Sequence, residues 1–255
     1  MQAYTEKQRQ IKEQFCLERG KWKWNAFWET ILSLNEDLLS AYSKLSSVPH
    51  KKGALDAKTK ELIYIAMDGA ITHMYLPGMK RHMIHAIDDI GITPGEIMET
   101  LIITSTIGAS AYAVGFPILM ERLQAHGFAD VPVELTAEQA ALKDRFIALN
   151  KYWSDTLESV LRHDVEIFEA YLDYMSASQV KKTLEPKIRE LLFVAVNAAP
   201  TTLNAVEIER HIDLALEYGA TKEELLEVFE VVCCLGIHTV LEGTPLLNEI
   251  LDRQR

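Results

Sequence analysis

The sequence has 255 residues, enough for one large domain or two of ordinary size, and its hydrophobic fraction of 48% is sufficient for a buried core. A net charge of −11, with no cluster of lysines and arginines, argues against binding to nucleic acid. The N-terminus lacks the apolar stretch of a secretory signal, and no apolar run suggests a membrane span. We therefore expect a cytoplasmic protein with no membrane partner.

The three cysteines, Cys16, Cys233 and Cys234, provide no disulfide framework. Cys233 and Cys234 are adjacent, and adjacent cysteines seldom pair. None of the three has the spacing of a CxxC redox motif or of a zinc site.

The first part of the chain has the apolar spacing of helices. The first ~20 residues are polar and mixed in charge, which is typical of a helical arm or a frayed tail. Apolar residues at steps of three and four predict a helix from Trp24 to Leu45. The serine- and proline-containing segment from Ser46 to Gly53 predicts a loop. Asp56 is the expected N-cap of a helix that runs to about Asp68.

The Pro-Gly pair at 77–78 predicts a break, followed by a helix that carries His82 in its early turns. Gly91 suits the C-terminal cap of that helix. Thr93, followed three residues later by Glu96, forms a capping box that predicts the start of another helix.

The rest of the chain continues the helical pattern. Small residues at 108–111 predict close packing or a bend, and a segment from Phe116 to Leu123 is the next helix. Residues 130–134 are the expected linker, and a helix from Thr136 to Leu149 follows. Because alternation of period two is absent and the loops are short, the sequence predicts an all-α protein.

The second half of the chain repeats the first. Matches at an offset of 129 include Glu61/Glu190, Arg81/Arg210 and His82/His211, and after a one-residue deletion the offset becomes 128, with Gly91/Gly219, Thr93/Thr221, Glu96/Glu224 and Gly108/Gly236. This period is too long for a solenoid. It predicts a tandem duplication, with a first repeat and its N-terminal helical arm over 1–129 and a second, more degenerate repeat over 130–255.

These matched residues resemble the carboxymuconolactone decarboxylase and alkylhydroperoxidase D superfamily, over nearly the whole chain and once per repeat. In the first repeat the resemblance is carried by Glu61, His82, Ala86, Gly91, Thr93, Glu96 and Gly108. It implies an alkylhydroperoxidase D-like helical domain that assembles into rings of six domain equivalents. For a tandem chain it therefore implies a homotrimer.

The chain departs from the peroxidase branch of this superfamily. Where that branch carries two cysteines, the first repeat reads Ile-Thr-His-Met-Tyr-Leu at 71–76 and the second reads Pro-Thr-Thr-Leu at 200–203. Peroxide reduction by that route needs a thiolate nucleophile and a resolving thiol. The missing CxxC motif therefore argues against a peroxidase.

Acid–base chemistry remains, and Glu61, His82 and Arg81 are its main candidates. A partly buried glutamate has a raised pKa and can exchange protons near neutral pH, whereas a first-turn glutamate in water would only favour the helix dipole. The resemblance gives His82 the role of proton carrier, and its alternative is a structural histidine. Arg81 is either a clamp for a substrate carboxylate or a surface charge.

The first repeat adds histidines that the second lacks, and we expect it to be the active copy. His73 is the further catalytic candidate, and His85 and Tyr75 are expected to bind substrate with Arg81. The equivalents in the second repeat are Glu190, His211 and Arg210.

Taken with the resemblance, these residues predict a decarboxylase or a related lyase or hydrolase. Its substrate would be a small organic carboxylate or lactone, and it would need no cofactor or metal. A non-catalytic binding or scaffold protein of the same fold is the alternative. A metal-dependent enzyme, with a zinc-like ion held by Glu61, His73, His82 and His85, is a weaker one.

Overall fold

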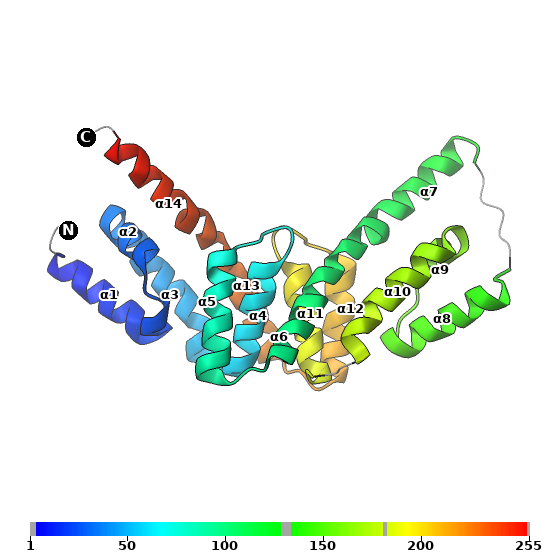
Figure 1. Cartoon of the computed structure of the whole chain (residues 1–255), viewed down its shortest axis with the longest axis horizontal. Coiled ribbons are helices and arrows are strands. Elements are labelled where there is room, and N and C mark those ends of the chain that lie inside the picture. The colour runs from blue at the N-terminus through cyan, green and yellow to red at the C-terminus, as the bar shows by residue number, and fades with distance from the viewer. Residues whose placement is uncertain (1–3, 129–133, 181–182, 254–255) are drawn as a thin grey trace. The chain divides into compact units, whose positions relative to one another are not determined.

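The computed structural model describes residues 4–128, 134–180 and 183–253, and no strand occurs in these ranges (Figure 1). The all-α prediction is therefore confirmed. The chain forms two compact units, one of residues 1–104 with 185–255 and the other of residues 105–184.

In the first unit, the N-terminal arm consists of α1 (Glu6–Arg19), the 3-10 turn η1 (Lys21–Lys23), α2 (Ala26–Leu34) and α3 (Glu36–Lys52). The C-terminal helix α14 (Ile237–Asp252) packs on α2 (Figure 1). Their shared apolar core contains Phe15, Trp28, Ile31, Leu32, Leu39, Tyr75, Ile237 and Leu241. A helix from the second repeat thus completes the arm of the first.

Two sequence predictions in this arm are wrong. The single helix from Trp24 to Leu45 is broken at Asn35, whose side chain accepts a hydrogen bond from the backbone of Leu38 and caps α3. The loop from Ser46 to Gly53 is instead the last part of α3, which continues through Pro49 and ends at Gly53 in the left-handed conformation. Local hydroxyl–carbonyl bonds, such as Ser47 to Lys44 at 3.0 Å, accompany this irregular turn.

The centre of the first unit holds matching helices from the two repeats. From the first repeat they are α4 (Ala57–Gly69), α5 (Leu76–His85), the π-helix η2 (Ala86–Ile90) and α6 (Pro94–Ser105). From the second they are α11 (Pro186–Ala198), α12 (Ala205–Glu217), α13 (Lys222–Cys233) and the 3-10 turn η5 (Cys234–Gly236).

Equivalent contacts relate the two repeats. Thr72 and Thr201, which are 129 residues apart, share a hydrogen bond of 2.9 Å between their hydroxyls. Two buried ion pairs cross from one repeat to the other in both directions, Lys60 with Glu227 and Arg189 with Glu99. These reciprocal contacts are the structural counterpart of the tandem duplication.

The predicted helix caps are confirmed. The Asp56 side chain accepts a hydrogen bond of 2.7 Å from the backbone of Thr59, and Thr93 and Glu96 bond reciprocally as a capping box. Gly91 ends η2 with a φ of +81°, a conformation that favours glycine.

The second unit contains the 3-10 turn η3 (Thr106–Ala109), the π-helix η4 (Ala111–Gly115) and four α-helices. These helices are α7 (Phe116–Ala125), α8 (Ala137–Asn150), α9 (Asp155–His163) and α10 (Val165–Val180). Its core contains Leu142, Phe146, Val160, Leu161, Phe168 and Leu172. The expected bend at 108–111 coincides with the change from η3 to η4. The helix predicted from Thr136 is α8, with Thr136 as its N-cap.

The predicted linker at 130–134 lies almost wholly outside the described residues, as does the predicted repeat boundary at 129/130. The compact units divide the chain differently from the sequence repeats, because α11 and α13 pack against α4 and α14 packs against α2. In the described part of the chain, one continuous helical stretch, 94–125, is long and apolar enough to cross a membrane by length and composition alone. A single stretch of this kind is weak support for a membrane span, although the sequence reading had found none.

Candidate functional site

Glu61 and His82 form a buried hydrogen-bonded pair. Glu61 lies in α4 and is only 4% exposed, so it is not a solvated first-turn glutamate. Its Oε2 lies 2.5 Å from Nδ1 of His82, which stands in the last turn of α5 rather than in its early turns. The helix starts at Leu76, with Pro77 in its first turn, and this brings His82 opposite Glu61.

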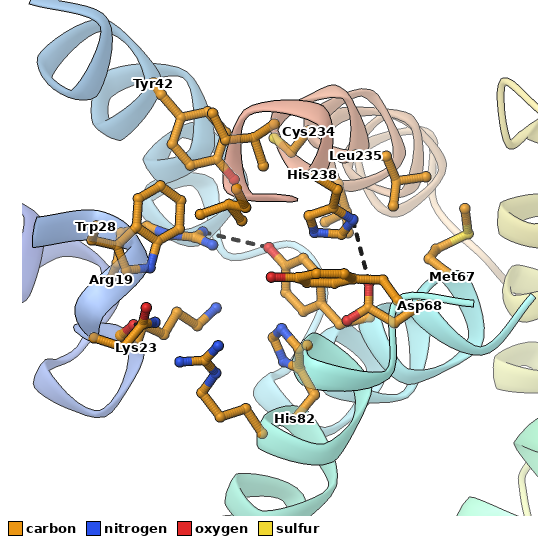
Figure 2. Close-up of a pocket in the computed structure, with 18 of the residues that line it drawn as sticks. Arg19, Lys23, Trp28, Tyr42, Met67, Asp68, His82, Cys234, Leu235 and His238 are labelled. Atoms are coloured by element: carbon orange, nitrogen blue, oxygen red, sulfur yellow. Dashed lines mark hydrogen bonds and ion pairs between the residues drawn. The ribbon is translucent and has the colours of Figure 1, made fainter. Parts of the chain in front are cut away.

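His82 lines a cavity of about 70 Å³, which has room for several waters. Its walls come from the N-terminal arm, from α4 and α5, and from η5 and α14 of the second repeat (Figure 2). Three cationic side chains line it: Arg19, Lys23 and Arg81. Arg81 is thus placed at the cavity, where a carboxylate clamp would have to be.

Lys23 is the most unusual of these cations. It is 8% exposed, and its Nζ has no hydrogen-bond partner among the described residues. The ammonium lies 4.6 Å from the ring centre of Tyr64 and 4.9 Å from that of Trp22. Burial, reinforced by the nearby Arg19 charge, lowers the pKa of Lys23 to about 7. Lys23 can therefore both hold an anion and exchange a proton near neutral pH.

Burial likewise lowers the pKa of His82 to about 4, because the loss of hydration outweighs the attraction of Glu61. For Glu61, burial favours the neutral form, but His82 and Lys23 outweigh it and lower the carboxyl pKa. At neutral pH the pair is thus a carboxylate and a neutral imidazole, in which Nδ1–H donates to Glu61. Nε2 of His82 then carries a free lone pair and has no hydrogen-bond partner among the described residues.

The second repeat keeps the pair but not the free nitrogen. Nδ1 of His211 bonds Oε2 of Glu190 at 2.6 Å, and Nε2 of His211 lies 2.9 Å from Nη2 of Arg210. Glu207 also pairs with Arg210 and lies 3.5 Å from the same imidazole nitrogen. Both nitrogens of His211 are therefore engaged by protein.

Of the other two predicted substrate-binding residues, Tyr75 lies at the cavity and His85 does not. Tyr75 lines the cavity and is buried, and its hydroxyl lacks a hydrogen-bond partner in the described part of the chain. Burial raises the pKa of Tyr75 to about 12, so this phenol stays protonated. His85 does not line the cavity, since its Nδ1 bonds Asp89 and its ring stacks on Trp22 at 4.0 Å.

His73, the further catalytic candidate, lies away from Glu61 and His82. Its Nε2 is 2.7 Å from Nδ1 of His238, and it lines a second cavity of about 470 Å³. The predicted metal-binding set is therefore wrong, because His73 and His85 make these other contacts. The group of possible ligands found within the described ranges is instead Asp68, His73 and His238.

Sequence reasoning missed Arg19, Lys23, Tyr64, Asp68 and His238 at the site. Three of these carried a signal, since Tyr64, Asp68 and His238 stand opposite Phe193, Asn197 and Ser110 at the equivalent positions of the other repeat. The arm residues carried none, because only packing shows that the arm covers α4 and α5.

One cysteine, Cys234, also lines the cavity. Burial raises the pKa of its thiol to about 12, so it is protonated at neutral pH. This supports the argument from the missing CxxC motif against a thiolate-dependent peroxidase.

The carboxymuconolactone decarboxylase family model matches residues 36–116 and 166–236, once in each repeat. A crystal structure from Burkholderia xenovorans, named "putative gamma-carboxymuconolactone decarboxylase subunit", is similar over 97% of this chain and 98% of that one. The two share 35% sequence identity with a TM-score of 0.91. No curated protein matches the sequence. The two matched segments and this likeness show that the chain belongs to the carboxymuconolactone decarboxylase family.

Proposed function

We propose that the protein is a non-redox acid–base enzyme, a decarboxylase or a related lyase or hydrolase, that acts on a small organic carboxylate or lactone. Its working site is the cavity of the first repeat. His82 carries the proton, Glu61 orients His82, and Lys23 with Arg81 binds the substrate anion. The second repeat supports this site without performing chemistry.

The observation that carries the proposal is the difference between the two Glu–His pairs. His82 has an unpaired Nε2 and lines the same cavity as the unpaired, buried ammonium of Lys23, whereas Arg210 occupies Nε2 of His211. Unpaired buried polar groups are costly, and they are expected where a ligand completes them. A carboxylate would pair with Lys23, and a proton on a reacting atom would pair with His82.

The chemistry that fits this arrangement starts with a carboxylate held by Lys23 and Arg81. In a lyase or hydrolase, neutral His82 removes a proton from carbon or from water, and the cations stabilise the oxyanion that forms. In a decarboxylase, the bond to the carboxylate breaks and CO₂ leaves. The electron pair of that bond passes into a conjugated carbonyl, and Nε2 of His82 then delivers to carbon a proton that it has taken from the Lys23 ammonium. Solvent restores that proton.

A scaffold without catalysis is the alternative. It would be favoured by a Glu61 side chain in bulk water, but Glu61 is buried and bonded to His82. The burial of Glu61 and its bond to His82, which lines a cationic cavity, therefore favour an enzyme.

The test measures the turnover of a panel of small lactones and β,γ-unsaturated carboxylic acids. CO₂ release and ultraviolet absorbance are the two readouts. Purified wild type is compared with Glu61→Gln and His82→Ala. We expect turnover in the wild type and a loss of about 100-fold or more in His82→Ala. Equal turnover in all three proteins would remove the assignment. Folded wild type that turns over nothing in the panel would favour the scaffold.

A further inference from the structure

We propose that Asp68, His73 and His238 bind a divalent transition-metal ion next to the acid–base site, since Asp68 and His238 line the same cavity as His82. Asp68 ends α4, His73 lies in the turn before α5, and His238 lies in the first turn of α14. One ligand atom from each of the three lies within 4.8 Å of the other two. The site thus joins the two repeats, because His238 comes from the second.

The distances fit the coordination of a small metal ion. Nε2 of His73 and Nδ1 of His238 are 2.7 Å apart, and that Nδ1 is 3.8 Å from Oδ1 of Asp68 (Figure 2). Tetrahedral ligands with metal bonds of about 2.0–2.1 Å lie about 3.3 Å from one another. Each of these two distances is about half an ångström from that value, and the ligand atoms of His73 and Asp68 lie within 4.8 Å of each other.

The Asp68 carboxylate is otherwise poorly compensated. It is 2% exposed, and its Oδ2 has no hydrogen-bond partner among the described residues. A buried carboxylate of this kind is expected to be paired or to bind a metal. Gly78 leaves room for it, since a Cβ at that position would lie 2.4 Å from Oδ2.

The internal repeat supplies an independent argument. The second-repeat equivalents of Asp68 and His73 are Asn197 and Thr202, and the first-repeat equivalent of His238 is Ser110. At all three positions a strong metal ligand thus stands opposite a weak one. The three strong ligands come from both repeats, yet they meet at one place.

Two imidazoles and one carboxylate suit zinc, iron or cobalt better than calcium or magnesium, which prefer oxygen ligands. Three protein ligands leave at least one coordination position for water or a small molecule. His73 and His238 also line the cavity of about 470 Å³, which offers access to that position. A hydrogen bond between the two histidines would explain their contact, but it would leave Asp68 without a partner.

The experiment uses untagged protein stripped of metal and then dialysed against Zn²⁺ or, separately, Co²⁺. Metal content is measured by mass spectrometry, and the visible spectrum of bound Co²⁺ reports its coordination. The variants Asp68→Asn, His73→Thr and His238→Ser each introduce the residue of the other repeat. His126→Ser, which removes an exposed histidine, is the matched control.

We expect about one Zn²⁺ per chain in the wild type and in His126→Ser, and at least 100-fold weaker binding in each of the three variants. A wild type that retains no Zn²⁺, or three folded variants that bind like the wild type, would overturn the proposal. A folded state is checked by circular dichroism. Because no substrate is used, the result is independent of the proposed acid–base function.

Discussion

At the residue scale, the charge on Lys23 determines how well the cavity can bind an anion. Its ammonium is buried between two aromatic rings and beside Arg19, so folding makes protonation unfavourable. The same property that prepares Lys23 to bind an anion should lower the stability of the protein without one. This cost is measurable in the pH dependence of unfolding.

We predict that Lys23→Met abolishes a rise in stability with pH that the wild type shows above neutral pH. The pKa of Lys23 is about 7 in the folded protein and 10.5 for an ordinary lysine. Between these values the unfolded chain binds a proton that the folded chain does not, so the free energy of unfolding rises with pH by roughly 1.4 kcal/mol per unit. Below pH 7 both states bind this proton, so Lys23 adds no pH dependence to the free energy of unfolding there.

Denaturant unfolding between pH 7 and 9.5 measures the effect. Lys21→Met, which removes an exposed lysine two residues away, should keep the wild-type slope. An unchanged slope in Lys23→Met would mean that Lys23 is not held in the buried, deprotonation-prone state described above.

The sequence identified the Glu61–His82 pair because both residues recur in the second repeat and match the family. It did not identify Lys23, whose neighbours in sequence are two tryptophans and whose role depends on the fold of the arm. The sequence also could not show that Nε2 of His82 is unpaired. The sequence has an arginine before each histidine, and only the structure shows Arg210 bonded to His211.

At the scale of elements, the start of α5 determines whether the cavity can form. Gly78 lies in the first turn of this helix, facing Asp68 and Tyr75. The second repeat has Glu207 at the equivalent position, and there the carboxylate contacts Arg210 and His211. The glycine thus leaves space at the first site, whereas the Glu207 side chain fills the equivalent space in the second repeat.

We predict that Gly78→Ala destabilises the protein by about 1–3 kcal/mol, since the added Cβ would lie 2.4 Å from both Asp68 Oδ2 and the Tyr75 ring. Gly243→Ala, in exposed α14 with no atom near the new Cβ, should instead stabilise it by about 0.5–1 kcal/mol. Denaturant unfolding measures the change in the free energy of unfolding for each of the two variants. Equal effects would contradict the close approach at Gly78.

Removal of one partner from the buried ion pair between α4 and α13 should destabilise the protein more strongly. Lys60 Nζ lies 2.6 Å from Glu227, whose other oxygen accepts hydrogen bonds from the backbone of Ala54 and Leu55. Lys60→Met keeps the side-chain volume but leaves the carboxylate without its counter-charge, and should cost about 3–5 kcal/mol. Lys7→Met, in a solvent-exposed pair with Asp37, is the control and should leave the unfolding midpoint unchanged. A similar small effect of Lys60→Met would contradict this account.

Element boundaries were predictable where a side chain caps the helix, as at Asp56, Thr93 and Thr136. They were not predictable where tertiary packing overrode local preference. Asn35 breaks a strongly periodic apolar segment, and Pro49 stays helical because α3 is packed against α1 and α13.

At the scale of the whole molecule, the resemblance implies a ring of six domain equivalents, which we propose is a homotrimer. Large apolar side chains that a monomer would leave in water support association. Those along residues 94–125 are Met98, Tyr112, Val114, Ile118 and Leu119. Association through these side chains is an alternative to a membrane span as the reason for this apolar helical stretch.

We predict a mass of about 87 kDa by light scattering after gel filtration, which is three chains of 28.9 kDa. Ile118→Lys, which places a charge among these side chains, should shift the protein toward smaller species. A wild type of 28.9 kDa at micromolar concentration would contradict the trimer.

The duplication and the all-α fold were readable from the sequence because matched residues kept one register over most of the chain. The packing of α14 against the N-terminal arm could not be predicted from the sequence, because a repeat pattern does not show which helices of the two copies pack together. That packing brings Cys234 and His238 of the second repeat to the site of the first.

The most direct test of the central claim compares the two equivalent histidines in one assay. On any substrate that the wild type turns over, His82→Gln and His211→Gln are measured side by side, with the folded state of each verified by circular dichroism. The account predicts at least a 100-fold loss of kcat/KM for His82→Gln and a loss within about 3-fold for His211→Gln. Equal losses, or a greater loss for His211→Gln, would contradict the assignment of the chemistry to the first repeat.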